Sequence, residues 1–241
     1  MEIALGFIIA ICIALTGVGA GALTTPLLIL LLGLPAKEVV GTALIFGAIV
    51  KTVAVPVYWA RRKVNWRALA FLLAGGLPGV LIGSLAMHNV SVNWVLAIVG
   101  FTVMLVALVN LFHFRDRTGH DRPRWLGLIA LPIGAEVGFS SAGAGALGAL
   151  ALMSLTKLAA SEIVGTDLAF GLALSLVGGG IHAALGAVNV AVLIKLSIGG
   201  VAGAIIGTML ASRVPSRQLR FALSVVLVIL GAQLFYKGFA G

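Results

Sequence analysis

Continuous apolar runs of about 20 residues fill almost the whole chain, and the polar breaks between them are short. A helical run of this length spans a bilayer, whereas transmembrane strands would alternate apolar and polar residues. Of the 241 residues, 61% are hydrophobic and 10% are charged, which excludes a sizeable water-soluble domain. We therefore predict an all-α integral membrane protein whose chemistry lies within the bilayer or in short loops.

The apolar runs form two series with the same order of elements. Each series begins with an element of about 30 residues that glycines interrupt, which is too long for one straight span and too short for two. Three uninterrupted helices follow in each series, so we predict about eight spans and up to ten helical pieces. The predicted elements cover residues 3–34, 38–60, 67–88, 92–113, 125–158, 161–185, 190–212 and 217–237.

The two series are similar in sequence at a spacing of 124 residues. The pentapeptide GAGAL occurs at Gly19–Leu23 and again at Gly143–Leu147, each time in an interrupted element. EVVGTALIFG at Glu38–Gly47 aligns in the same way with EIVGTDLAFG at Glu162–Gly171. We therefore predict a tandem duplication. Its parts are a first membrane repeat at 1–113, a cytoplasmic linker at 114–124 and a second membrane repeat at 125–241.

Loop charges predict that the two repeats have opposite orientations. The loop ARRKVNWR at 60–67 carries four basic residues, whereas the aligned turn at 186–189 carries none. The reverse holds for SRVPSRQLR at 212–220, which has three arginines, and the aligned HNVSVN at 88–93. Because basic loops favour the cytoplasm, aligned loops face opposite sides and both termini lie outside. The net charge of +9 thus reflects membrane topology, and we expect no nucleic-acid binding.

The interrupted elements are the first candidate site. A helix broken near the middle of the bilayer exposes backbone amides at the positive end of a helix dipole, where an anion can bind. Glycine also lets a ligand approach the backbone closely. The alternative interpretation is that small residues only permit tight helix packing. The candidate anion-binding residues are Gly19, Gly21, Gly143 and Gly145, with hydroxyl groups from Thr24, Thr42, Ser141 and Thr166.

Ionisable residues within the apolar runs are the second candidate site, since burial of a charge in the membrane is unfavourable without a role. Lys51 lies deep in its helix and would either supply positive charge to a bound anion or pair with a buried carboxylate. Asp167 and Glu136 would either couple a proton to transport or serve a structural role such as pairing with Lys51. His182 is a candidate proton relay or an interfacial histidine with a structural role.

The sequence offers no pattern typical of an enzyme or a metalloprotein. His113 and His120 flank the linker beside two aspartates, but their spacing fits no metal site. We therefore expect no enzyme activity, no metal ion and no cofactor. Two alternatives stay open, namely an intramembrane enzyme using His182 with Glu136 or Asp167, and a structural membrane subunit.

Several stretches resemble the sulfite exporter TauE/SafE family of probable membrane transporters. They include GVGAGALTTPLL at 17–28, GLPAKEVVGTALI at 33–45 and EIVGTDLAFGLALSLVGGGIHAALGAVN at 162–189. The resemblance implies a multi-pass protein of the bacterial inner membrane. It also implies secondary transport of a small anion such as sulfite, a sulfonate or a related organic anion. An anion channel is the alternative mechanism, and the oligomeric state stays open, with a homodimer as one alternative.

Overall fold

The computed structural model describes residues 1–16, 19–112, 122–210 and 216–240. These residues form ten helices and no strand. The helices are α1 (Glu2–Thr16), α2 (Ala20–Leu32), α3 (Ala36–Ala60), α4 (Trp66–Asn89), α5 (Val92–Phe112), α6 (Trp125–Ser140), α7 (Leu147–Leu155), α8 (Ala160–Ala184), α9 (Val190–Leu210) and α10 (Ser216–Ala240).

Six of these helices, α3, α4, α5, α8, α9 and α10, are long and apolar enough to cross a membrane. The all-helical membrane architecture is therefore confirmed within the described residues. The predicted count of about eight spans is not confirmed, because each interrupted element consists of two short helices. The division at 113 and 125 also stays a prediction, since most of the linker lies outside the described residues.

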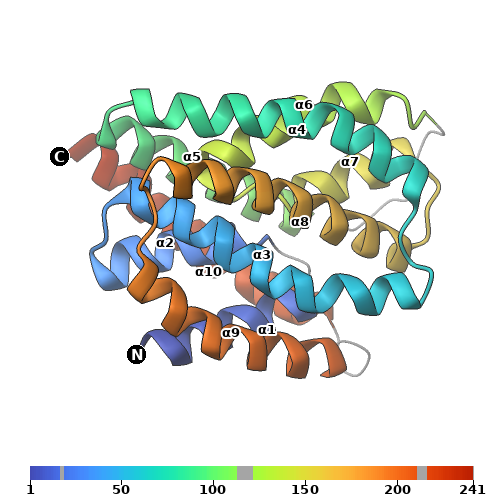
Figure 1. Ribbon diagram of the computed structural model, residues 1–241, viewed down its shortest axis with the longest axis horizontal. Coiled ribbons are helices and arrows are strands. Elements are labelled where there is room, and N and C mark those ends of the chain that lie inside the picture. The colour runs from blue at the N-terminus through green and yellow to red at the C-terminus, as the bar shows by residue number, and fades with distance from the viewer. Residues whose placement is uncertain (17–18, 113–121, 211–215, 241) are drawn as a thin grey trace.

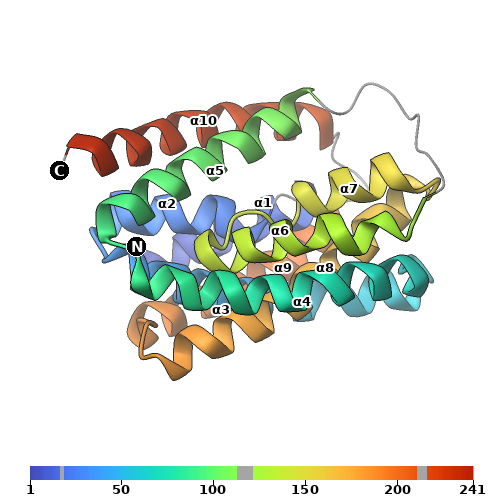
Figure 2. The same ribbon diagram turned by 90° about the horizontal axis from the view of Figure 1, so that it is seen from above.

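The short helices form two hairpins that enter the molecule from opposite ends. Both termini lie at one end, and α1 runs inward from there before α2 returns (Figure 1). The α6–α7 hairpin enters from the other end and turns near the middle (Figure 2). In the second hairpin the turn contains Ser141 at φ 66° and Gly145 at φ 114°, a left-handed backbone that ends α6.

Two pairs of helices, α4 with α6 and α1 with α9, pack closely through glycines at their contacts. In α4, a Cβ on Gly75 would collide with the Gly127 carbonyl of α6, and one on Gly83 would collide with the Ala135 carbonyl. These contacts advance together along both helices, so α4 and α6 are parallel. The same arrangement joins α9 to α1, where the facing pairs are Gly199 with Ile3, Gly203 with Phe7 and Gly207 with Ile11.

The long helices α3 and α8 lie side by side across the middle of the molecule (Figure 1). The turns of both hairpins reach them, because Ala20 packs against Gly47 of α3 and Ala144 packs against Gly171 of α8. At the outer surface many large side chains are exposed and apolar, among them Leu128, Met209 and Phe239. Such a surface suits contact with lipid chains.

Candidate functional site

The turns of the two hairpins lie against each other. A Cβ on Gly19 would collide with the Ala144 carbonyl, and one on Gly21 would collide with the backbone and hydroxyl of Ser141. The hydroxyls of Thr25 and Ser141 are 2.6 Å apart and share a hydrogen bond. The glycine breaks of the two interrupted elements therefore meet, and close backbone approach requires glycine at Gly19 and Gly21.

Both returning helices begin without a side-chain cap. The N-cap residue of α2 is Gly19 and that of α7 is Ala146, and neither has a side-chain group that could accept a backbone hydrogen bond. The first amides of a helix have no acceptor within it, and they carry the positive end of the helix dipole. Two helix starts without a side-chain cap thus lie at the meeting point of the hairpins, where the Ala22 and Leu147 N–H groups donate to the Gly19 and Gly143 carbonyls.

Lys51 lies beside this meeting point, on α3, and only 3% of its surface is exposed. A Cβ on Gly171 would be 2.9 Å from Lys51 Nζ and 3.3 Å from Ala144 Cβ. Lys51 Nζ donates hydrogen bonds to the Gly171 carbonyl at 3.2 Å and to Ser175 Oγ at 3.0 Å. An ammonium group has three donors, so one remains for a ligand.

Lys51 does not form a direct ion pair with a carboxylate among the residues that the structure describes. Asp167 acts on it electrostatically, but its carboxylate is not within ion-pair distance. Of the two interpretations offered by the sequence, the geometry therefore favours a charge held by neutral groups. Such a charge remains available to a buried anion.

Asp167 lies on α8 with 4% of its surface exposed and faces the second hairpin. A Cβ on Gly148 of α7 would collide with Asp167 Oδ1, and the carboxylate interacts with the Gly145 backbone amide. Oδ1 has no hydrogen-bond partner in the described part of the chain. The carboxylate thus occupies the position at which an external anion would meet the start of α7.

Glu136, on α6, also contacts the turn between α6 and α7. Its Oε1 accepts a hydrogen bond from Ser140, one turn later in α6, and its Oε2 lies against Gly143. The Ser140 hydroxyl also accepts from the Ala142 backbone N–H at 3.1 Å. Both predicted acids therefore contact the second turn, one from within its own hairpin and one from α8.

Sequence comparisons agree with this architecture. The family model of the sulfite exporter TauE/SafE matches residues 2–234. The chain belongs to the TauE/SafE family. It is 32% identical to the probable membrane transporter protein YjnA of Bacillus subtilis (strain 168). The alignment covers 96% of this chain and 98% of the relative. It is also 25% identical to a probable membrane transporter protein of Xylella fastidiosa, in an alignment that covers 88% of this chain and 85% of the relative. No solved structure matches it.

Two candidate hydroxyls of this TauE/SafE protein lie away from the hairpin turns. Thr42 Oγ1 donates to the Glu38 carbonyl and accepts from the Asn189 backbone N–H at 2.9 Å. Thr166 Oγ1 accepts from the Asn65 backbone N–H at 2.9 Å. Each threonine therefore anchors a loop at one end of the molecule, and the structure does not bring either hydroxyl to the centre.

Thr24 and His182 are fully buried. Thr24 Oγ1, on α2, has no hydrogen-bond partner among the described residues, so it is available to a ligand at the first turn. His182 Nε2 lies 2.9 Å from the Gly138 carbonyl and must donate to it, which leaves Nδ1 as an acceptor. Its ring is 5.3 Å from that of His88.

Three site residues were not singled out by sequence reasoning: Ser175, Gly47 and Gly171. A signal for all three was available. Ser175 is the residue that aligns with Lys51 at the spacing of 124, and Gly47 aligns with Gly171. Residues that align between two crossing helices can meet where the helices cross, and here they enclose the lysine amine.

Proposed function

We propose that this protein is a secondary transporter that moves a small anion across the bacterial inner membrane by alternating access. The observation that supports this most directly is the convergence of two helix starts without a side-chain cap on one buried lysine. The amides, the Lys51 ammonium group and the hydroxyls of Thr24 and Ser141 form a set of donors suited to sulfite or a sulfonate. Thr42 and Thr166 contribute by holding the surrounding helices.

The proposed mechanism rests on two inverted repeats, 1–113 and 125–241, joined by the linker at 114–124. Contacts that recur 124 residues later support it. The α4–α6 contacts of Gly75 with Gly127 correspond to those of Gly199 with Ile3, and the two threonine anchors correspond in the same way. Hairpins that enter from opposite ends would open the central site to one side and then to the other.

We base proton coupling on competition between the carboxylates and the substrate anion for the backbone amides of the second hairpin turn. While Asp167 and Glu136 are ionised, their carboxylates lie against the Gly145 and Gly143 backbone and repel an entering anion. Protonation removes that repulsion and leaves the amides to the substrate. A proton and an anion would then bind and leave together.

The test is flux of labelled sulfite and of a panel of sulfonates in proteoliposomes, with and without a pH gradient. We expect saturable uptake that a gradient accelerates and that countertransport of unlabelled anion stimulates. Absence of flux for every anion in the panel would contradict transport. Conductance too large for a conformational cycle would instead indicate the channel mechanism.

A further inference from the structure

A cleft of about 390 Å³ opens at the end of the molecule opposite both termini. Its lining comes from two separate parts of the chain, the start of α4 and the segment that leads into α6. Arg67, Arg122 and Arg124 supply the polar lining, and Pro123 and Trp125 complete it. The three arginines are exposed, and Trp125 is 53% exposed.

The cleft forms where α6 begins alongside α4, and the two helices run in the same direction. The contact between Gly127 and Gly75, which lies well inside α4, holds the first turn of α6 against α4. Neither helix has an acidic residue in its first turn, and Arg124 at the N-cap of α6 makes no side-chain cap. The positive end of the α6 dipole is therefore added to three guanidinium groups.

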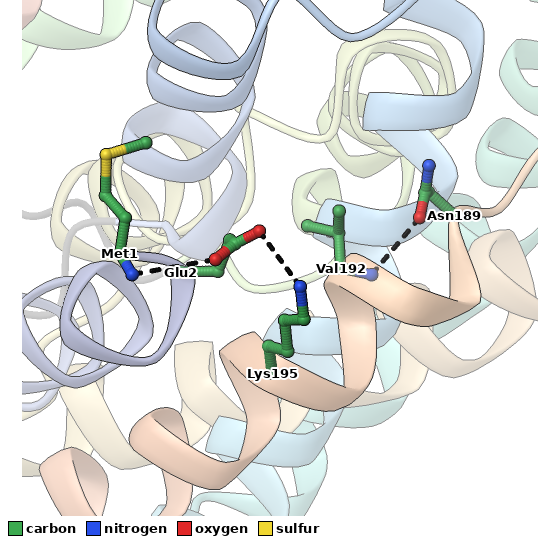
Figure 3. Close-up of polar contacts among 5 residues, drawn as sticks. All are labelled: Met1, Glu2, Asn189, Val192 and Lys195. Atoms are coloured by element: carbon green, nitrogen blue, oxygen red, sulfur yellow. Dashed lines mark hydrogen bonds and ion pairs between the residues drawn. The ribbon is translucent and has the colours of Figure 1, made fainter.

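No carboxylate offsets this charge within the described residues, where both ion pairs involve Glu2. At the opposite end of the molecule, by contrast, a carboxylate does offset positive charge. There α1 begins alongside the parallel helix α9, and Glu2 lies 3.3 Å from Lys195 Nζ and 3.6 Å from the terminal amine (Figure 3). The helix caps do not differ, since Asn189 Oδ1 accepts from the Val192 N–H at the start of α9 (Figure 3) and Asn65 Oδ1 accepts from the Ala68 N–H at the start of α4.

The two ends thus have the same helix arrangement but differ in the source of negative charge. At the end that contains the termini, the chain provides a carboxylate. At the arginine cleft the charged side chains among the described residues are all cationic, so the cleft suits an anion from outside the chain. Guanidinium groups match the phosphate group in geometry, since their planar forks form paired hydrogen bonds with it.

We propose that the arginine cleft binds the phosphate headgroup of an anionic membrane lipid. The surroundings of the cleft favour a lipid over a soluble phosphate. Trp125 is the kind of residue that lies at headgroup depth, and the next exposed side chain of α6, Leu128, is apolar and 66% exposed. A lipid can fill the cleft with its phosphate and cover this apolar surface with its chains. The site does not depend on the proposed transport function.

The experiment measures binding of phosphatidylglycerol and phosphatidylcholine to the purified full chain by native mass spectrometry. The test variant is Arg67→Gln with Arg122→Gln and Arg124→Gln. The matched control is Arg61→Gln with Lys63→Gln and Lys157→Gln, which removes three charges at the same end but outside the cleft. We expect the test variant to lose at least about tenfold in affinity for phosphatidylglycerol and the control less than about threefold.

A second variant, with the three cleft arginines changed to lysine, keeps the charge and tests the guanidinium geometry. We expect it to fold and to lose about threefold or more in phosphatidylglycerol affinity, with no change for phosphatidylcholine. Equal losses in the test and control variants would overturn the proposal, because binding would then follow net charge alone. Full displacement of the lipid by millimolar inorganic phosphate would also overturn it and would indicate a site for soluble anions.

Discussion

The two hairpin turns meet at the centre of the molecule but differ in chemistry. The first turn presents glycines and the hydroxyls of Thr24 and Thr25, whereas the second turn has two carboxylates lying against it. The aligned positions show where the difference arises, since Glu136 aligns with Cys12 and Asp167 aligns with Ala43. In the proposed transporter, the first half therefore supplies the anion cradle and the second half supplies the groups that bind and release a proton.

Replacing the lysine that serves both turns should have the largest effect. Lys51→Met removes the ammonium group but keeps an unbranched apolar side chain of similar length. We expect anion flux to fall by about 100-fold, since a hydrogen bond to a charged group contributes up to about 3 kcal/mol. The control is Lys195→Met, at the periphery of α9. Flux in proteoliposomes measures both variants, and equal activity of Lys51→Met and wild type would refute a central binding role.

Removing the charge of Asp167 should abolish proton coupling at the second turn without abolishing anion binding. Asp167→Asn keeps the shape of the side chain but cannot bind and release a proton. We expect acceleration by a pH gradient to fall by about tenfold, while exchange of labelled for unlabelled anion continues, because exchange needs no net proton movement. Glu162→Gln, at the exposed start of the same helix, should retain the gradient response. A gradient response that survives in Asp167→Asn would exclude Asp167 as the coupling group and leave Glu136 and His182 as candidates.

Adding a methyl group at the contact between the turns tests their close approach. Gly21→Ala would place a Cβ against the Ser141 backbone, which cannot move aside as a flexible side chain can. Overpacking of this kind costs about 1–3 kcal/mol, so we expect a lower unfolding temperature and weaker transport. Gly180→Ala, at a helical glycine with open space around it, is the control. Thermal unfolding in detergent distinguishes them; an unchanged midpoint for Gly21→Ala would mean that the turns are farther apart.

The smallest effect is expected where the aligned loops differ in conformational strain. Arg62 has φ 54°, and the aligned residue, Gly186, has φ 69°. Because the left-handed conformation costs a residue with a Cβ about 1 kcal/mol, Arg62→Gly should stabilise the protein by up to about that amount. Gly186→Ala should destabilise it by a similar amount. Unfolding midpoints test both, and a change of the same sign in the two variants would contradict the explanation.

Sequence reasoning anticipated the helical class, the two interruptions and the depth of Lys51, because each of these follows from local apolar patterning or from the repeat. It did not anticipate the roles of Thr42 and Thr166. Their partners, Asn189 and Asn65, lie more than 100 residues away, so loop packing decides whether these hydroxyls reach the centre.

The count of membrane spans shows a second limit of the sequence. Apolar composition identified the interrupted elements but did not reveal whether each half-helix crosses the bilayer. The α6–α7 hairpin returns because Ser141 adopts a left-handed backbone, which sequence patterning does not predict for serine. The identity of the transported anion also depends on distances between donors from both hairpins.

The contact between Lys51 and Ser175 also bears on the history of the molecule. An ancestor assembled from two identical half-length chains would have placed the same side chain on both sides of this contact. Two ammonium groups about 3 Å apart would repel by about 5 kcal/mol at an effective dielectric constant of about 20. If the two series arose by the duplication that the sequence predicts, the lysine could become established only after the two copies differed in sequence at this position.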